Sequence, residues 1–137
     1  MSRVQLAVNV ADLDSAVSFY SELFSTEPAK VRPGYANFAV DDPPLKLVLI
    51  ESTAAVSGSL NHLGVEVATS GEVSAAGERL SRAGLGVAVE EAVSCCYARQ
   101  DKVWVSGRGG ERWEIYTVLG DADTGLDCCA PPEGTSV

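Results

Sequence analysis

A few side chains in this 137-residue sequence could bind a metal ion or a soft, thiol-seeking group. His62 is the single histidine, and imidazole is a common ligand of transition metals. Glu114 is a lone carboxylate between a bulky aromatic residue and an aliphatic one. The four cysteines form two adjacent pairs, Cys95-Cys96 and Cys128-Cys129. Which of these side chains act together depends on the fold that positions them.

The cysteines are expected to be free thiols. A disulfide between adjacent residues closes a strained eight-membered ring, so each pair is a poor structural disulfide. A reducing compartment would leave all four as thiols. The sequence has no Cys-x-x-Cys spacing, which argues against a structural zinc site.

The composition excludes several classes of function. The net charge is -9, and the ten basic residues are scattered, which argues against binding to nucleic acid. The first ten residues are too short and polar for a signal peptide, and Asp12 and Asp14 follow at once. No apolar run approaches the length of a membrane span. These features predict a cytoplasmic globular protein without a membrane partner.

The strongest internal pattern is a repeat of one short segment. Residues 5–10 read Gln-Leu-Ala-Val-Asn-Val, and residues 62–67 read His-Leu-Gly-Val-Glu-Val. Alternating apolar and polar side chains predict a β-strand at each copy. Because the repeat aligns Gln5 with His62, a pseudo-symmetric fold is expected to place these two side chains opposite each other at one cleft.

The same series of elements follows each repeated strand. Asp12 is the predicted N-cap of a helix that runs to Phe24. Thr69 and Glu72 predict a capping box for a second helix, which ends at Gly84. Three more strands are expected in each half, near 28–32, 35–40 and 45–51 and then near 86–90, 96–106 and 111–119.

The predicted fold class is therefore α+β, with two βαβββ modules that form a curved mixed sheet around a metal-containing cleft. Neither module alone would bury its sheet face well. The domain is expected at 1–119, with modules at about 1–51 and 61–119 and a linker at 52–60. Residues 120–137 carry no periodicity and are expected to form a flexible tail.

The repeat and Glu114 together predict a metal site with three protein ligands, Gln5, His62 and Glu114. The matching strand of the first half, residues 45–50, has no carboxylate at its centre. Three ligands leave coordination positions open, as in the facial triads of non-haem iron enzymes. Taken singly, a histidine at a strand start is usually a half-buried polar residue, and a glutamate on a terminal strand often faces water. The equivalent positions of Gln5 and His62 favour the metal site.

With these features the chain resembles the vicinal oxygen chelate superfamily, which includes glyoxalase I, fosfomycin-resistance proteins and extradiol dioxygenases. It is most similar to the C–As lyase group and the related cadmium-induced proteins. The resemblance covers residues 1–119. It rests on residues 4–6, 33–38, 43–49, 60–66 and 111–116, and on Cys95-Cys96 followed by 100–105. Most extradiol enzymes have histidine at the position of Gln5, whereas the C–As lyases are similar to this chain in using an amide.

The resemblance implies an Fe(II)-dependent dioxygenase that cleaves the carbon–arsenic bond of trivalent organoarsenicals and releases arsenite, in arsenic detoxification. Fe(II) on Gln5, His62 and Glu114 would activate dioxygen. Cys95 and Cys96 would bind arsenic, because soft thiolates suit soft centres. Both sulfurs can chelate only from a loop, since adjacent strand residues point opposite ways. Tyr97, Lys102 and Trp104 are the candidates to line the substrate pocket.

Two alternatives stay open. One is a non-enzymatic binding protein in which the thiols of Cys95 and Cys96 sequester cadmium or arsenic. The other is a different metal-dependent enzyme of the same fold, a glyoxalase or thiol transferase, although a glyoxalase needs a fourth ligand. The resemblance leaves open whether the substrate is a methyl or aryl arsenical and whether a homodimer assembles the site. No role is assigned to Cys128 and Cys129.

Overall fold

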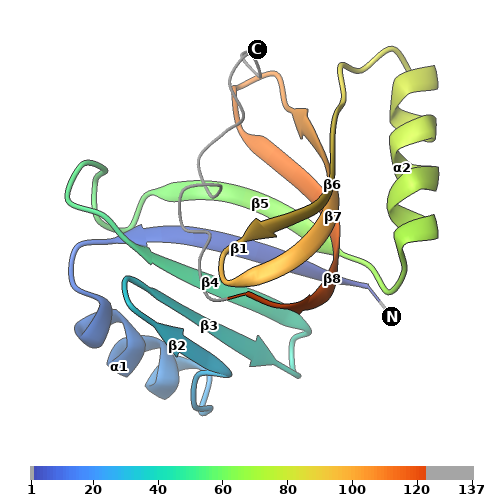
Figure 1. The fold of residues 1–137 in the computed structure, drawn as a ribbon. Helices are drawn as coiled ribbons and strands as arrows, with labels where there is room; N and C mark the ends of the chain where they lie inside the picture. The colour runs from blue at the N-terminus through green and yellow to red at the C-terminus, as the bar shows by residue number, and fades with distance from the viewer. Residues whose placement is uncertain (1, 123–137) are drawn as a thin grey trace. The chain divides into compact units, whose positions relative to one another are not determined.

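The computed structural model describes residues 2–122 and divides them into two compact units (Figure 1). The N-terminal unit comprises residues 3–61, and the C-terminal unit continues from His62. The predicted tail lies outside the described residues from position 123 onward, and with it Cys128 and Cys129. Among residues 2–122, no helix combines the length and the apolar character needed to cross a membrane.

The N-terminal unit is a four-stranded mixed sheet with one helix. Its strand order is β2-β3-β4-β1, with β1 and β4 parallel and the other neighbours antiparallel. Asp12 caps the helix by accepting a hydrogen bond from the backbone N–H of Ser15, as predicted. The elements are β1 (Arg3–Val10), α1 (Leu13–Leu23), β2 (Lys30–Arg32), β3 (Tyr35–Val40) and β4 (Leu45–Glu51).

The alternation of side chains along these strands explains where α1 packs. Phe38, Leu47 and Leu49 are buried on one face of the sheet, together with Val10 and Leu13. The apolar side of α1 covers this face and contributes Ala16, Val17 and Tyr20, together with Phe24 at the C-cap. The opposite face carries the other set of alternating residues, which includes Gln5.

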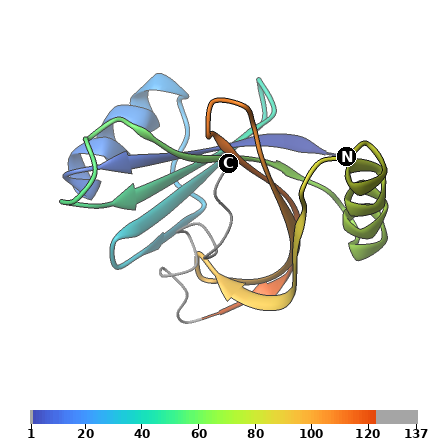
Figure 2. The same ribbon diagram turned by 90° about the horizontal axis from the view of Figure 1, so that it is seen from above.

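The C-terminal unit repeats this architecture with its own helix. Its strand order is β5-β8-β7-β6, and β5 and β8 are parallel. Figure 2 shows α2 on one side of these strands. Gly77 allows a close approach, because a Cβ there would lie 3.2 Å from Cγ1 of Val103. The elements are β5 (Leu60–Glu66), α2 (Ser70–Arg82), β6 (Ala88–Cys95), β7 (Ala98–Ser106) and β8 (Arg112–Asp121).

The structure confirms the α+β class and the order βαβββ in both halves, including the capping box of Thr69 and Glu72. Three predicted boundaries in the second half are wrong. β6 runs to Cys95 rather than ending near residue 90, because a β-bulge interrupts its alternation between Glu90 and Val93. Cys96 lies in a turn rather than at the start of a strand, and β8 continues to Asp121.

Candidate metal centre

Two of the three predicted metal ligands meet in the interior of the C-terminal unit. Nε2 of His62 lies 2.8 Å from Oε2 of Glu114, although 52 positions separate the two residues in the chain. The parallel pairing of β5 and β8 brings His62 and Glu114 together. Glu114 lies directly opposite Gly64, and His62 lies two residues before Gly64 on β5. Both side chains are almost completely buried. We call this pair the His62–Glu114 dyad.

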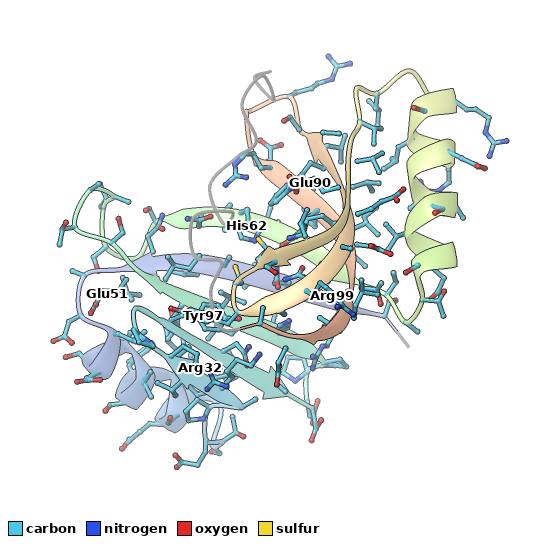
Figure 3. The ribbon with its side chains drawn as sticks, viewed as in Figure 1. Arg32, Glu51, His62, Glu90, Tyr97 and Arg99 are labelled. Carbon is cyan, nitrogen blue, oxygen red and sulfur yellow. The ribbon has the colours of Figure 1, made fainter. Side chains whose placement is uncertain are left out.

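The dyad lies on one face of the four-stranded sheet, which we call the site face. Residues paired directly across neighbouring strands share a face, so the register fixes its members. Figure 3 shows His62 on β5 and Glu90 on β6 among these side chains. The site face includes His62, Gly64, Arg112, Glu114, Tyr116, Trp104, Lys102, Gln100, Ala98, Ala88, Glu90, Val93 and Cys95.

Lys102 gives the dyad a buried counter-charge. Its Nζ lies 2.7 Å from Oε1 of Glu114, and the side chain is 1% exposed. The two oxygens of Glu114 therefore have different neighbours: Oε1 meets Lys102 and Oε2 meets His62. A buried carboxylate without such partners would carry a large desolvation cost.

These neighbours determine the ionisation of Glu114. Burial alone would raise the pKa of this carboxyl, because it disfavours the charged form. The charge of Lys102 and the hydrogen bond from His62 outweigh burial and lower the pKa from 4.5 to about 2. Glu114 is therefore a carboxylate at neutral pH, which is the form that binds metal ions.

Trp104 is the common neighbour of the charged groups. Its ring meets the His62 ring edge-to-face at 5.3 Å between centroids. The cations of Lys102 and Arg112 lie 5.3 Å and 5.0 Å from its ring centroid. Its Nε1 donates a hydrogen bond of 2.9 Å to Oε1 of Glu90. Trp104 is 1% exposed and packs against the His62 ring, and its role as a pocket wall stays a prediction.

The donor atoms of the dyad fit a metal ion. Two protein donors at about 2.1 Å from one metal, at a right angle, lie about 3.0 Å apart. The 2.8 Å between Nε2 and Oε2 is close to that separation. One imidazole nitrogen and one carboxylate oxygen suit Fe, Mn or Zn. Among residues 2–122 there is no cluster of three or more His, Cys, Asp or Glu side chains that could hold a metal ion.

Gln5, the third predicted ligand, lies on β1 in the N-terminal unit and is buried. Gln5 pairs with Lys46, two positions before the pair of Ala7 and Val48, and His62 lies two positions before Gly64, which pairs with Glu114. The repeat therefore makes Gln5 and His62 equivalent positions, as predicted from the sequence. That Gln5 joins His62 and Glu114 on one metal stays a prediction.

The same register identifies the counterpart of Glu114 in the first module. Ala7 pairs with Val48, as Gly64 pairs with Glu114. Val48 is 1% exposed, so the equivalent position is filled by a buried aliphatic side chain. The position of the first module that is equivalent to Glu114 therefore carries no carboxylate.

The predicted substrate-binding cysteines lie at the far end of β6. Cys95 is its last residue, and Cys96 and Tyr97 form a two-residue hairpin turn before Ala98. Both turn residues have positive φ angles, 51° and 61°, as a type I′ turn requires. The carbonyl of Cys95 accepts a 2.7 Å hydrogen bond from Nε2 of Gln100.

The expectation of free thiols is wrong for this structure. Both Cys95 and Cys96 are disulfide-bonded. The prediction that the pair lies in a loop holds for Cys96, while Cys95 is buried at a strand end. Cys95 pairs with Ala98 at the start of β7, and Lys102, which contacts Glu114, lies four residues further along the same strand.

The remaining pocket candidates have different roles in the fold. Lys102 and Trp104 contact the dyad or each other, whereas Tyr97 belongs to the hairpin turn. Sequence reasoning missed Arg112 and Glu90, which contact Trp104. The spacing of Arg112 two residues before Glu114 could have placed it on the same face. No comparable signal existed for Glu90, because the bulge hides the register of β6.

Comparison with known proteins identifies what this arrangement is similar to. Residues 3–115 match the model of the glyoxalase/bleomycin resistance protein/dioxygenase superfamily. A trivalent organoarsenical cleaving enzyme of Thermomonospora curvata is 56% identical over 99% of this chain and 93% of its own length. The cadmium-induced protein CadI of Mycobacterium tuberculosis is 62% identical over 90% of this chain and 81% of its own.

Solved structures agree on the fold. The 2,3-dioxygenase LapB of Pseudomonas sp. KL28 matches 98% of this chain and 45% of its own with a TM-score of 0.67. The sequence identity is 16%, so this likeness concerns the fold alone.

Proposed function

Because this chain belongs to the glyoxalase/bleomycin resistance protein/dioxygenase superfamily, we propose that it is an Fe(II)-dependent dioxygenase that cleaves the carbon–arsenic bond of trivalent organoarsenicals. Release of arsenite by this reaction would serve arsenic detoxification. The observation that carries the proposal is the buried His62–Glu114 dyad, which shares one sheet face with Cys95. The similarity to an organoarsenical cleaving enzyme along almost the whole chain supports the choice of substrate.

Gln5, His62 and Glu114 are the proposed ligands of Fe(II). When bound there, Fe(II) would supply the activation of dioxygen that the reaction needs. Because Lys102 holds Oε1 of Glu114, only Oε2 is turned toward His62. The edge-to-face contact with Trp104 limits rotation of the His62 ring. These two neighbours keep the donor atoms of the dyad in place.

Cys95 and Cys96 are the proposed binding site for arsenic, in their reduced form. Reduction of the disulfide bonding at these two residues requires a thiol reductant, which supplies two electrons for each bond broken. Two thiols then replace the two hydroxyls of R–As(OH)₂, forming two As–S bonds and releasing two molecules of water. A reducing compartment keeps the thiols available, so we place the protein in the cytoplasm.

The overall reaction balances with dioxygen as the sole oxidant. For a methyl substituent, CH₃As(OH)₂ and O₂ give formaldehyde and As(OH)₃. The carbon loses four electrons, dioxygen gains four, and arsenic stays trivalent. The As–C bond breaks, and the released arsenic gains one hydroxyl. The carbon product is therefore as diagnostic of the reaction as the arsenite.

An anaerobic titration tests the proposal. The reduced protein is loaded with Fe²⁺, mixed with methylarsonous acid and then exposed to dioxygen. We expect arsenite and formaldehyde in equal amounts, and no product from the Glu114→Ala variant. Iron-loaded, reduced protein that binds the arsenical but releases neither product would exclude the lyase.

The second candidate function is sequestration of cadmium or arsenic by the thiols of Cys95 and Cys96. The similarity to the cadmium-induced protein CadI supports it. In that function Cys95 and Cys96 suffice, and the dyad has no part. Removal of Glu114 would then leave metal protection of cells unchanged. Cells that carry Glu114→Ala and lose resistance to organoarsenicals, but not a capacity to bind arsenite, would favour the enzyme.

A further inference from the structure

The β-bulge in β6 decides which side chains of this strand reach the site face. Glu90 pairs with Lys102, and Val93 pairs with Gln100, so two residues of β6 lie opposite the single residue Asp101. In an unbroken strand, Ala92 would lie opposite Gln100, and Ser94 rather than Cys95 would face the dyad.

Solvent exposure along β6 shows the same shift. Ala88 and Glu90 are partly buried before the bulge, and Val93 and Cys95 are the less exposed residues after it. Ser94, which alternates with them, is exposed. The bulge therefore places both Glu90 and Cys95 on the face that carries the dyad.

Asp101 holds the bulge in place. Its Oδ1 accepts a 2.7 Å hydrogen bond from the backbone N–H of Ala92, whose φ of 51° is unfavourable for a residue with a side chain. Its Oδ2 accepts a hydrogen bond of 2.5 Å from Oγ of Ser70, the first residue of α2. The hydrogen bonds from Ser70 and Ala92 lower the pKa of Asp101, so it is ionised at neutral pH.

We propose that Asp101 is a positioning residue for the substrate thiols: by anchoring the bulge at Ala92 to the start of α2, it keeps Cys95 on the face of the His62–Glu114 dyad. Asp101 lies on the opposite face of β7 from Gln100 and Lys102, so it touches neither the dyad nor the cysteines by direct pairing. It acts through the register of β6. This inference rests on the proposed function for its substrate, but the register it describes is measurable without turnover.

The first experiment measures position rather than activity. A fluorophenyl arsonous acid is bound to the reduced protein, and Mn²⁺ or diamagnetic Zn²⁺ is bound to the dyad. In the wild type, Mn²⁺ broadens the fluorine NMR signal through proximity. In Asp101→Ala we expect weaker broadening and loss of hydrogen-exchange protection at the Ala92 amide, with unchanged arsenical stoichiometry and Mn²⁺ affinity. Equal broadening and equal protection in this variant would overturn the proposal.

The turnover number of Asp101 variants provides a second test of the proposal. Misplacement of a substrate by about 1 Å can cost about a hundredfold in rate. We expect a loss of that order in kcat for Asp101→Ala, with arsenical capture retained, and partial rescue by Asp101→Asn, which keeps one acceptor oxygen. The matched control is Asp12→Ala, because Asp12 also accepts hydrogen bonds from a backbone N–H and a serine hydroxyl at a helix start, in the other unit. Its kcat should match the wild type.

A deletion separates positioning from general loss of structure. Removing Ala92 leaves one residue opposite Asp101 and keeps Cys95 opposite Ala98 without a bulge. In this background Asp101→Ala should change neither the broadening nor kcat. A further loss in the double variant would show that Asp101 acts in another way. Wild-type protein that shows the broadening but no arsenite release would refute the proposed function while leaving the register argument intact.

Discussion

The two modules have the same strand register, but their side chains at equivalent positions differ in charge and in their ability to bind a metal. In the second module His62 and Glu114 meet at 2.8 Å, and Lys102 neutralises the carboxylate. In the first module the equivalents of His62 and Glu114 are Gln5 and Val48. The backbone register thus makes these positions equivalent, and the side chains on them decide whether the proposed metal can bind. The one buried carboxylate of the pair of positions is also the one with a buried cation beside it.

The largest effect is expected when the second module is made to resemble the first. Glu114→Ala removes one donor and leaves Lys102 buried without its carboxylate. Breaking a buried ion pair costs about 3–5 kcal/mol. We expect a large fall in the free energy of unfolding and loss of stoichiometric Fe²⁺ binding. Urea unfolding and anaerobic titration measure both, and full iron uptake by a folded variant would remove Glu114 from the ligand set.

The reverse change tests whether register alone is enough. Val48→Glu places a carboxylate at the position equivalent to Glu114, where Tyr35 stands in the place of Lys102. Without a cation on the neighbouring strand, burial of this charge costs several kcal/mol, on the order of 3. We expect a lower Tm than for Val48→Ala at neutral pH, with recovery in acid as the new carboxyl is protonated. Equal Tm values at neutral pH would contradict the need for a counter-charge.

Acid should weaken the second module through Glu114. Its pKa falls from 4.5 to about 2 on folding, so the folded state binds this proton less tightly than the unfolded state. The stabilisation is complete above about pH 4.5 and is lost as the pH falls toward 2. In metal-free protein the difference in unfolding free energy between the wild type and Glu114→Gln should shrink across this window. A difference independent of pH would show that Glu114 is not ionised in the folded state.

The smallest effect concerns the start of α2. Thr69 accepts a hydrogen bond from the backbone N–H of Glu72, and Glu72 bonds back to the N–H of Thr69. Thr69→Ala should cost about 1 kcal/mol of stability, the usual value for an N-cap. Because the cap is remote from the dyad, Fe²⁺ affinity should stay unchanged. A shift of iron affinity in this variant would couple the helix start to the metal site.

The sequence repeat predicted the two modules and the equivalence of Gln5 and His62, because strand alternation and helix caps are local signals. It could not predict Lys102 as the partner of Glu114, since that contact depends on the pairing of β7 with β8. The sequence also contains no local signal for the bulge at Ala92, so the end of β6 could not be predicted. Free thiols were expected at Cys95 and Cys96, but both are disulfide-bonded, and disulfide bonding depends on redox state as well as on local spacing.

The ion pair of Lys102 and Glu114 has a consequence for how the protein matures. Small zinc domains fold only when they bind their metal, because no other group offsets the cost of bringing their ligands together. Here an internal cation already balances the carboxylate, so the chain can reach its final fold before it is loaded. Folding and binding of the proposed metal can then be separate events, because the folded protein does not depend on the metal to compensate Glu114.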